Sequence, residues 1–342
     1  MNNRQPATED QQQAGDNWGL LGHEWAVEML KGHLAYNMVR HAYLFTGPRG
    51  IGRRTLALHF AQALNCPQPV SPGNPCRECR TCRQIEAMQF PDLAVIQAEK
   101  EGGVLKVEQV REVQYSLSLK PFLGKYRVAL FLRFQEANPN ASNALLKTLE
   151  EAPPHVVLLM TADSAEGLLP TITSRCEILR LHMLPVERVE VFLKARGING
   201  ATSRLLAHLS GGRPGHALRL AEDPAALDFR RERLNDISKL LAANRHGRFT
   251  YAEWLAKDKE IFRGVLLIWQ AYWRDVLLRA AGSTAPLANV DRAEEIEALA
   301  AKLTLSNARR LVSDSGRAVE RLERNVNARL LAEVVLMDWP RG

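Results

Sequence analysis

The sequence lacks any long hydrophobic run. No apolar stretch in its 342 residues approaches the about 20 residues that a membrane-spanning helix requires. Residues 1–16, MNNRQPATEDQQQAGD, contain no apolar segment like that of a secretory signal, and their polar, Gln-rich composition predicts a disordered tail. We therefore expect a cytoplasmic protein that makes no membrane contact.

Cysteine is scarce, and no charge of one sign dominates the chain. The five cysteines are expected to be metal ligands or free thiols, because disulfides are rare in the cytoplasm. The net charge is +7, but Lys and Arg are spread along the whole chain, so contact with nucleic acid or an acidic partner is permitted and not required. The composition, 46% hydrophobic and 24% charged, is that of a globular protein, and the length predicts two or three domains.

Residues 41–60, HAYLFTGPRGIGRRTLALHF, have the architecture of a phosphate-binding loop. A short apolar strand precedes a glycine-rich turn that contains Gly47, Gly50 and Gly52, and an amphipathic helix follows. In this context the backbone N–H groups of the loop and of the helix N-terminus point at an anion.

The side chains that give such a loop its catalytic chemistry are missing. The motif ends in Lys, which reaches the terminal phosphates, and then Ser or Thr on magnesium, whereas this chain has Arg53 and Arg54. Thr55 follows one residue later, about 100° further round the helix. We predict a loop that hydrolyses no nucleotide, and we do not expect this chain to bind ATP. Weak residual binding and a tight glycine turn without a ligand are the alternatives.

An acidic pair is also missing from a later strand. Residues 126–132, YRVALFL, are apolar enough to form a strand buried on both faces. In a P-loop ATPase this strand ends in the acids that hold magnesium, but here Leu132 and Arg133 occupy those positions. Glu136 is offset from them, and we expect it to be solvated. This second loss agrees with the first.

Four of the cysteines are predicted to form a metal site. Cys66, Cys76, Cys79 and Cys82 have the spacing C-x9-C-x2-C-x2-C, which suits a tetrahedral zinc site. An iron–sulfur cluster is the rival, but its fourth cysteine would fall at position 86, which is Glu. A cysteine-rich loop without metal is the third alternative. Four protein ligands leave no open position, so the predicted zinc is structural.

Strands and helices alternate up to about residue 182, and helices follow. We predict strands at 92–97, 126–132, 156–160 and 177–181, and helices at 18–39, 107–119 and 140–151, which together indicate a parallel α/β sheet. Beyond them we predict helices at 186–195, 203–209, 252–281, 292–303, 307–323 and 327–336, with a linker near 246–249. An apolar stripe is expected at Ile261, Val265, Ile268, Tyr272 and Val276.

The order and spacing of four segments resemble the bacterial clamp-loader proteins of the AAA+ superfamily. The segments are HAYLFTGPRGIG, the four-cysteine insert, NALLKTLEEAP and LLPTITSRC, and the resemblance covers roughly residues 18–337. In that family the gamma and tau ATPase subunits keep the loop lysine and the acidic pair, whereas the delta-prime branch commonly lacks them. The chain resembles the delta-prime branch.

The resemblance implies an organisation and a set of partners. The expected parts are a tail at 1–16, an AAA+ α/β domain at 17–182 with a zinc insert at 66–82, a small helical lid at 183–245 and an all-helical collar at 246–342. The implied partners are the delta subunit, the gamma/tau ATPase subunits, the sliding clamp and primer–template DNA.

The resemblance also implies roles for single residues. Arg175 of the Ser-Arg-Cys motif would be an arginine finger that acts in trans on the ATP site of a neighbouring subunit. Thr161 stands at the sensor-1 position, and Gly215 stands where ATPase relatives carry a sensor-2 arginine. Without the resemblance, Arg175 would be interpreted as a surface arginine.

Two other functions stay open. One is an active gamma/tau-type ATPase with a divergent phosphate loop, against which Arg53, Arg54, Leu132 and Arg133 all argue. The other is a nucleic-acid-binding zinc protein. Its loop would need basic residues interleaved with aromatics, and no aromatic lies between the cysteines.

Overall fold

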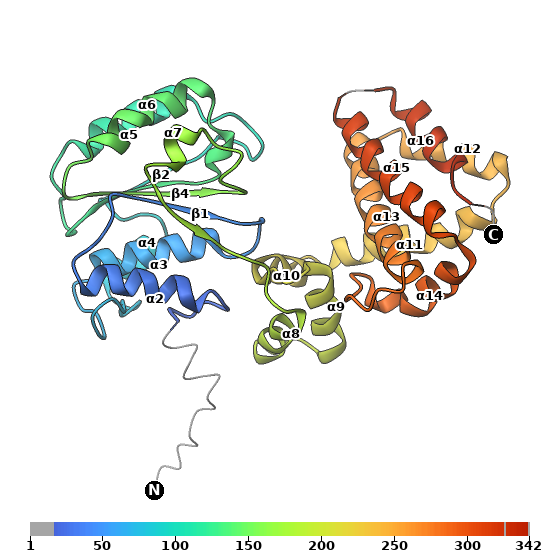
Figure 1. The fold of residues 1–342 in the computed structure, drawn as a ribbon, viewed down its shortest axis with the longest axis horizontal. Coiled ribbons are helices and arrows are strands. Elements are labelled where there is room, and N and C mark those ends of the chain that lie inside the picture. The colour runs from blue at the N-terminus through green and yellow to red at the C-terminus, as the bar shows by residue number, and fades with distance from the viewer. Residues whose placement is uncertain (1–16, 325, 341–342) are drawn as a thin grey trace, which may run out of the picture. The chain divides into compact units, whose positions relative to one another are not determined.

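The computed structural model describes residues 17–324 and 326–340 (Figure 1). The tail expected over residues 1–16 lies outside them. The chain forms two units: the first runs to Pro185 and includes Arg213–His216, and the second contains Val186–Gly212 and the chain from Ala217 onward. Among the described residues, no helix has both the length and the apolarity to cross a membrane.

The first unit is built on a parallel sheet of five strands. Their order is β2 (Leu93–Ile96), β3 (Arg127–Phe131), β4 (Val156–Ala162), β1 (Ala42–Thr46) and β5 (Glu177–Arg180). All residues of β1 and β4 are buried, as expected for strands covered on both faces. The prediction of a parallel α/β sheet is confirmed.

Helices cover both faces of the sheet (Figure 1). The elements on one face are α2 (Glu24–Ala35), α3 (Arg53–Asn65) and α4 (Arg80–Glu86), and those on the other are α5 (Val107–Leu117), α6 (Pro139–Glu150) and α7 (Pro170–Thr173). Alternate residues of β1 enter the two cores, with Tyr43 and Phe45 on the α3 side and Ala42 and Leu44 on the α6 side.

The predicted helix at 18–39 is too long. Trp18 lies in a turn with a positive φ of 52°, and α2 begins only at Glu24. Trp18 is nevertheless buried, and its ring stacks on Phe60 of α3 with 6.4 Å between the centroids. The apolar pattern thus identified a core residue and misplaced the start of the helix.

The second unit is helical. It contains α8 (Val186–Ala195), α9 (Gly200–Ser210), most of α10 (Pro214–Glu222), α11 (Pro224–Ala242), α12 (Arg245–Leu255), α13 (Lys259–Ala280), α14 (Ala293–Lys302), α15 (Leu305–Glu323) and α16 (Ala328–Met337). The short 3-10 turn Phe134–Glu136 follows β3 in the first unit, and a second one, Val290–Arg292, precedes α14. Trp269 and Trp273 of α13 are fully buried and pack edge-on against Trp339. The division of this region into lid and collar stays a prediction.

Two expectations for the second unit are wrong. The linker near 246–249 is part of α12, and its Arg248 is buried. The helix predicted at 252–281 is two helices, because Asp258 accepts hydrogen bonds from the N–H groups of Glu260 and Ile261 and starts a new helix there. As a result Ile261 is 39% exposed, and Phe262 occupies the core instead.

Candidate functional site

The phosphate-type loop joins β1 to α3 at the carboxyl edge of the sheet. Gly47, Gly50 and Gly52 have φ values of 140°, 85° and 114°, in the left-handed region that favours glycine. The α3 helix begins at the next residue, Arg53. The strand–turn–helix architecture expected from the sequence is therefore present.

Arg53 is turned into the protein and neutralised there. Its side chain is only 8% exposed, and its Nη1 atom donates to Oδ1 of Asp163 at 2.8 Å. The other carboxylate oxygen of Asp163 accepts from Nε2 of Gln135 at 3.1 Å. The cation at the lysine position of the motif is thus already paired with an anion of its own chain.

The next two positions of the motif are on the surface. Arg54 and Thr55 are both exposed on the first turn of α3. Arg53 thus contacts Asp163 at the end of β4, whereas Arg54 and Thr55 point to the surface of α3.

The carbonyl groups of the loop are held from two directions. The N–H of Gly215 donates to the carbonyl of Gly50 at 2.8 Å, and a Cβ atom at position 215 would lie 3.0 Å from that oxygen. On the other side, Nε2 of His23 lies 3.2 Å from the carbonyl oxygen of Ile51. Position 215, the expected sensor-2 position, therefore brings backbone instead of a cation to the loop.

The end of β3 has no acidic pair. Leu132 is buried, and Arg133 adopts a positive φ of 53° with its N–H donating to Oγ1 of Thr161 at 2.9 Å. Thr161 is itself only 3% exposed, so its hydroxyl joins the ends of β3 and β4. The expectation for Glu136 was wrong: its side chain is only 10% exposed, and it accepts from Nε of Arg133 at 2.8 Å and from the N–H of Gly102.

Arg175 lies at the opposite edge of the sheet. It precedes β5, whose first residue, Glu177, pairs with Tyr43 near the start of β1. The phosphate loop follows the other end of β1, so the length of that five-residue strand, about 16 Å, separates the two sites. Arg175 borders a hollow of about 490 Å³ that is also lined by Arg40, His41, Glu150, Ser174 and Glu177.

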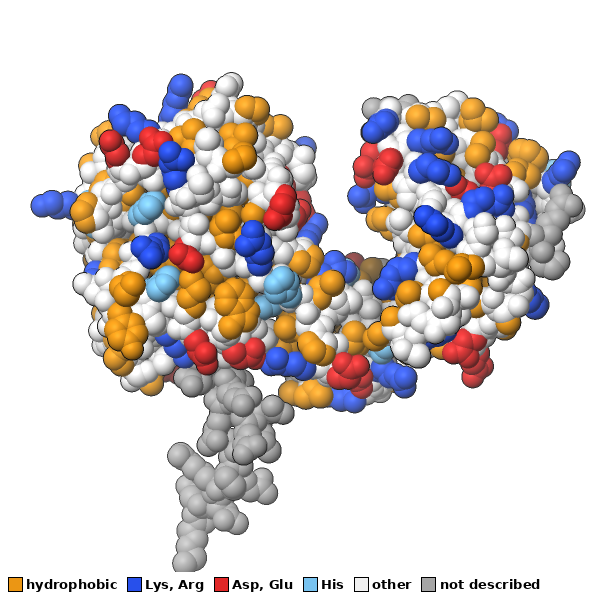
Figure 2. Space-filling model, in the orientation of Figure 1, with side chains coloured by type: hydrophobic (Ala, Val, Ile, Leu, Met, Phe, Trp, Pro, Cys, Tyr) orange, Lys and Arg blue, Asp and Glu red, His pale blue; other side chains and the backbone are white. Residues whose placement is uncertain are grey.

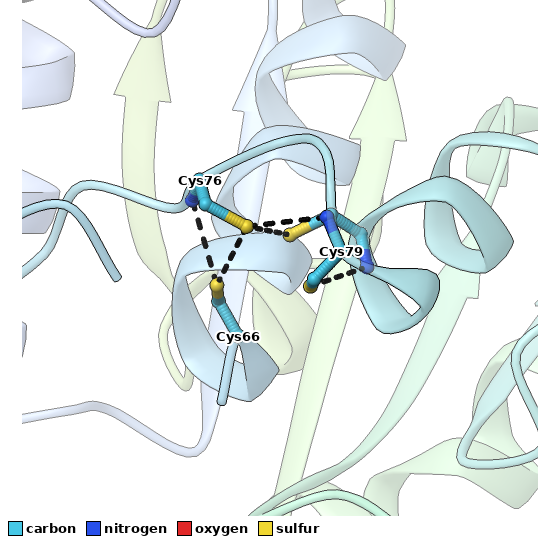
Figure 3. A group of neighbouring side chains, drawn as sticks. Cys66, Cys76 and Cys79 are labelled. Atoms are coloured by element: carbon cyan, nitrogen blue, oxygen red, sulfur yellow. Dashed lines mark hydrogen bonds between the residues drawn. The ribbon is translucent and has the colours of Figure 1, made fainter. Parts of the chain in front are cut away.

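Four sulfur atoms form a separate cluster beside α3 and α4. The Sγ atoms of Cys66, Cys76, Cys79 and Cys82 all lie within 4.8 Å of one another. Figure 3 shows the side chains of Cys66, Cys76 and Cys79 close together. The Cys66–Cys76 and Cys76–Cys82 distances are 3.6 and 4.0 Å. Zinc–sulfur bonds of about 2.3 Å in a tetrahedron place sulfur atoms about 3.8 Å apart, so the four residues are close enough to hold one metal ion.

Backbone N–H groups surround these sulfurs. The N–H groups of Cys76, Cys79 and Cys82 donate to the sulfurs of Cys66, Cys76 and Cys79 at 3.4, 3.3 and 3.4 Å. Burial raises the pKa of the Cys66 and Cys82 thiols. Burial also raises the pKa of Cys76, but hydrogen bonds from the backbone of Cys79 and Glu78 outweigh it and lower that pKa to about 7. Such donors stabilise the thiolate form that binds metals.

Positive and negative side chains are mixed on one face of the molecule. On the face in Figure 2, Lys and Arg side chains interleave with Asp and Glu.

Sequence reasoning missed Asp163 and the approach of Gly215 to Gly50. Asp163 directly follows β4, and in a parallel sheet the residues after the strands meet at one edge. That position was the available signal. The contact of Gly215 joins residues 165 positions apart, and no sequence pattern marks it.

Two family models match the chain. One, described as DNA polymerase III, delta subunit, matches residues 22–185, and the other, described as its C-terminal part, matches residues 224–341. Together they span most of both units.

Named relatives are subunits of the same polymerase. The chain is 38% identical over 184 residues to subunit delta-prime of Pseudomonas aeruginosa, covering 53% of this chain and 55% of that protein. It is 35% identical over 172 residues to subunit tau/gamma of Haemophilus influenzae, covering 50% of this chain and 24% of that protein. The chain therefore spans about half the length of the delta-prime relative and about a quarter of the length of the tau/gamma relative.

Solved structures are more distant. A gamma subunit-related protein of Thermotoga maritima is 16% identical with a TM-score of 0.47, over 91% of this chain and 97% of that one. The RuvB branch-migration motor of the same organism has a TM-score of 0.41 over 64% of each chain at 18% identity. At this distance the likeness carries no functional argument.

Proposed function

Because the chain belongs to the AAA+ clamp-loader subunits of DNA polymerase III, we propose that it is the delta-prime type, which hydrolyses no ATP itself. It would assemble with the delta subunit and the gamma/tau ATPases, and it would support loading of the sliding clamp on primer–template DNA. Its own contribution to catalysis would be Arg175, supplied in trans to a neighbouring ATP site.

The carrying observation is that the two candidate sites lie at opposite edges of one sheet. A phosphate held at Gly47–Gly52 would be separated from Arg175 by the length of β1. If Arg175 is a finger, its target would lie in another chain, because the phosphate loop of its own subunit is at the far edge of the sheet. A guanidinium is suited to this role because it keeps its charge and stabilises the charge that develops on phosphoryl transfer.

The phosphate loop supports the loss of hydrolysis. Arg53 is paired with Asp163, and Leu132 and Arg133 stand where magnesium-binding acids belong. Gly215 adds backbone in place of a third phosphate contact. ATP binding by this chain is therefore not part of the proposal.

An active ATPase of the gamma/tau type is the second candidate. The 35% identity to a tau/gamma subunit supports this second candidate about as well as the 38% identity to a delta-prime subunit supports the first. The difference lies in the loop residues just described, so the test is ATP turnover by the isolated chain.

We also propose that the four cysteines hold structural zinc. Zinc would link the loop 66–82 to α3 and α4 without an open coordination position. The lid at 183–245 and the collar at 246–342 are part of the same proposal.

The decisive experiment reconstitutes the clamp-loader assembly with this chain. The isolated chain should show no ATP turnover, and Arg175→Ala should lower the DNA-stimulated turnover of the assembly by at least about tenfold. Arg196→Ala, which removes an exposed arginine of the second unit, is the matched control. Unchanged turnover with Arg175→Ala would refute the finger, and steady turnover by the isolated chain would favour the second candidate.

A further inference from the structure

The guanidinium of Arg175 is held by its own chain. Its Nη2 atom donates to Oε1 of Glu150 at 2.7 Å, and its Nη1 atom donates to the carbonyl of Thr171 at 2.9 Å and to Oγ of Ser174 at 3.4 Å. The side chain is 35% exposed, so it lies against the surface and borders the hollow. Three contacts from two elements therefore fix one face of the group.

Glu150 occupies an unfavourable place for a carboxylate. It is the last residue of α6, where the partial negative charge of the helix C-terminus repels an anion. A basic residue would stabilise the helix better at this position. Helix stability therefore does not explain a glutamate at position 150, whereas the ion pair of Glu150 with Arg175 does.

The remaining donors of Arg175 are available to a partner. A guanidinium has five N–H groups, and the three contacts use three of them. The N–H of Nε and one N–H of Nη2 have no acceptor among residues 17–324 and 326–340. Two such donors suit a planar, two-point contact with phosphate oxygens.

We propose that Glu150 is a positioning residue for the arginine finger. The ion pair holds the guanidinium in one orientation, whereas a free arginine samples many rotamers. In that orientation the two spare donors face an anion presented by the neighbouring subunit. Glu150 itself contacts no nucleotide in this arrangement. The inference rests on the proposed role of Arg175 and adds the residue that orients it.

The test uses the assembled clamp loader with Glu150→Gln, Arg175→Ala and the double variant. Glu151→Gln is the matched control, because Glu151 is the exposed neighbour on the same chain and makes no contact with Arg175. Both residues of the pair are partly exposed, so Glu150→Gln should lower kcat about two- to fivefold. The KM for ATP should stay unchanged, because the residue does not bind the nucleotide.

The double variant separates positioning from a general structural effect. If Glu150 acts through Arg175, Glu150→Gln should cause no further loss in the Arg175→Ala background. In the isolated chain, the same substitution should speed modification of Arg175 by phenylglyoxal, since the guanidinium loses its ionic partner. A structural defect would instead lower turnover equally in both backgrounds, and that result would overturn the inference.

The remaining outcomes are also decisive. If Arg175→Ala lowers turnover and Glu150→Gln leaves it unchanged or raises it, Glu150 does not position the finger and the proposed function stands alone. If Arg175→Ala has no effect, the finger and its positioning residue are both refuted.

Discussion

The Arg53 guanidinium and the Asp163 carboxylate form an ion pair of 2.8 Å at the position where an ATPase of this architecture needs a free lysine. Arg53 is almost fully buried, and Asp163 is 60% exposed. The pair therefore neutralises the one buried cation of the loop motif from the solvent side. A phosphate arriving here would have to displace a carboxylate that is already bound.

Restoring the loop motif alone should not restore hydrolysis. The double substitution Arg53→Lys and Arg54→Thr recreates the Lys-Thr pair, but Leu132 and Arg133 still provide no carboxylate for magnesium. We expect no ATP turnover by this variant, measured as phosphate release from the isolated chain. Adding Leu132→Asp and Arg133→Glu provides the comparison. Turnover by the first variant without the second pair would show that the strand end is not limiting.

Zinc content should follow the cysteine cluster and not the fifth cysteine. Metal analysis of the purified chain should find about one zinc per molecule, because four thiolates make one closed site. Cys79→Ser should lose most of the metal. Cys176→Ser is the matched control, because this half-buried thiol lies outside the cluster and donates to the carbonyl of Ile172. Iron in the product, or metal retained by Cys79→Ser, would contradict the zinc assignment.

Metal removal should also loosen the segment before α2. Nε1 of Trp18 donates to the carbonyl of Gly73 in the cysteine loop, and Nη1 of Arg77 donates back to the carbonyl of Trp18 at 2.9 Å. A loop without a core of its own depends on its metal for folding. Chelation should therefore speed hydrogen exchange at residues 17–22 as well as at 66–82. Unchanged exchange at 17–22 would show that the two segments are independent.

The pH dependence of stability should report His59. Burial lowers the pKa of this fully covered imidazole to about 4, and the positive charge of Arg77 adds to the effect. The Oε2 atom of Glu86 lies 3.7 Å from Nε2, and that carboxylate is half exposed. A histidine in the unfolded chain has a pKa of about 6.5. Between pH 6.5 and 4 the unfolded chain therefore binds more protons at this position than the folded chain does.

The sign of the effect follows from this difference. The free energy of unfolding has its full value with respect to His59 above about pH 6.5. As the pH falls toward 4, protonation of His59 in the unfolded chain lowers that free energy by roughly 3 kcal/mol at most. Urea unfolding between pH 7 and 5 should show a shallower slope for His59→Leu than for the wild type. His246→Leu, an exposed histidine of α12, should leave the slope unchanged. Equal slopes for all three proteins would contradict the assignment.

Local patterns predicted the sheet and the cysteine cluster. The apolar runs at β1, β3 and β4 dictate strands buried on both faces, and the C-x2-C-x2-C spacing keeps three ligands within seven residues. The pair of Arg53 with Asp163 was not predictable in this way, because it joins residues 110 positions apart. Only the folded sheet brings them to the same edge.

The second unit shows why polar segments mislead. Residues 246–249, HGRF, contain a glycine and two basic side chains, which predict an exposed linker. In the structure Arg248 is 3% exposed, since tertiary contacts supply enough acceptors to bury a guanidinium that usually stays in water. Arginine burial depends on distant carbonyl groups, and the sequence gives no sign of them.

Arg248 should therefore be among the most stabilising residues of the second unit. Its guanidinium donates to the carbonyls of Leu240, Leu336 and Trp339 at 2.9 to 3.0 Å, and to those of Leu241 and Pro340. These bonds join the end of α11 to the chain around the end of α16. Arg248→Met keeps the apolar stem and removes every donor, so that these five carbonyls lose their arginine partner.

We expect Arg248→Met to lower the free energy of unfolding by about 2–4 kcal/mol, measured by urea denaturation of the full chain. Arg248→Lys should recover only part of this loss, because a lysine has three donors on one atom and does not reproduce the fork. Arg245→Met, an exposed arginine on the same helix, should change stability by less than about 0.5 kcal/mol. If Arg248→Met proves no more destabilising than this control, the carbonyls around it find other partners, and the arginine does not hold the C-terminal helix in place.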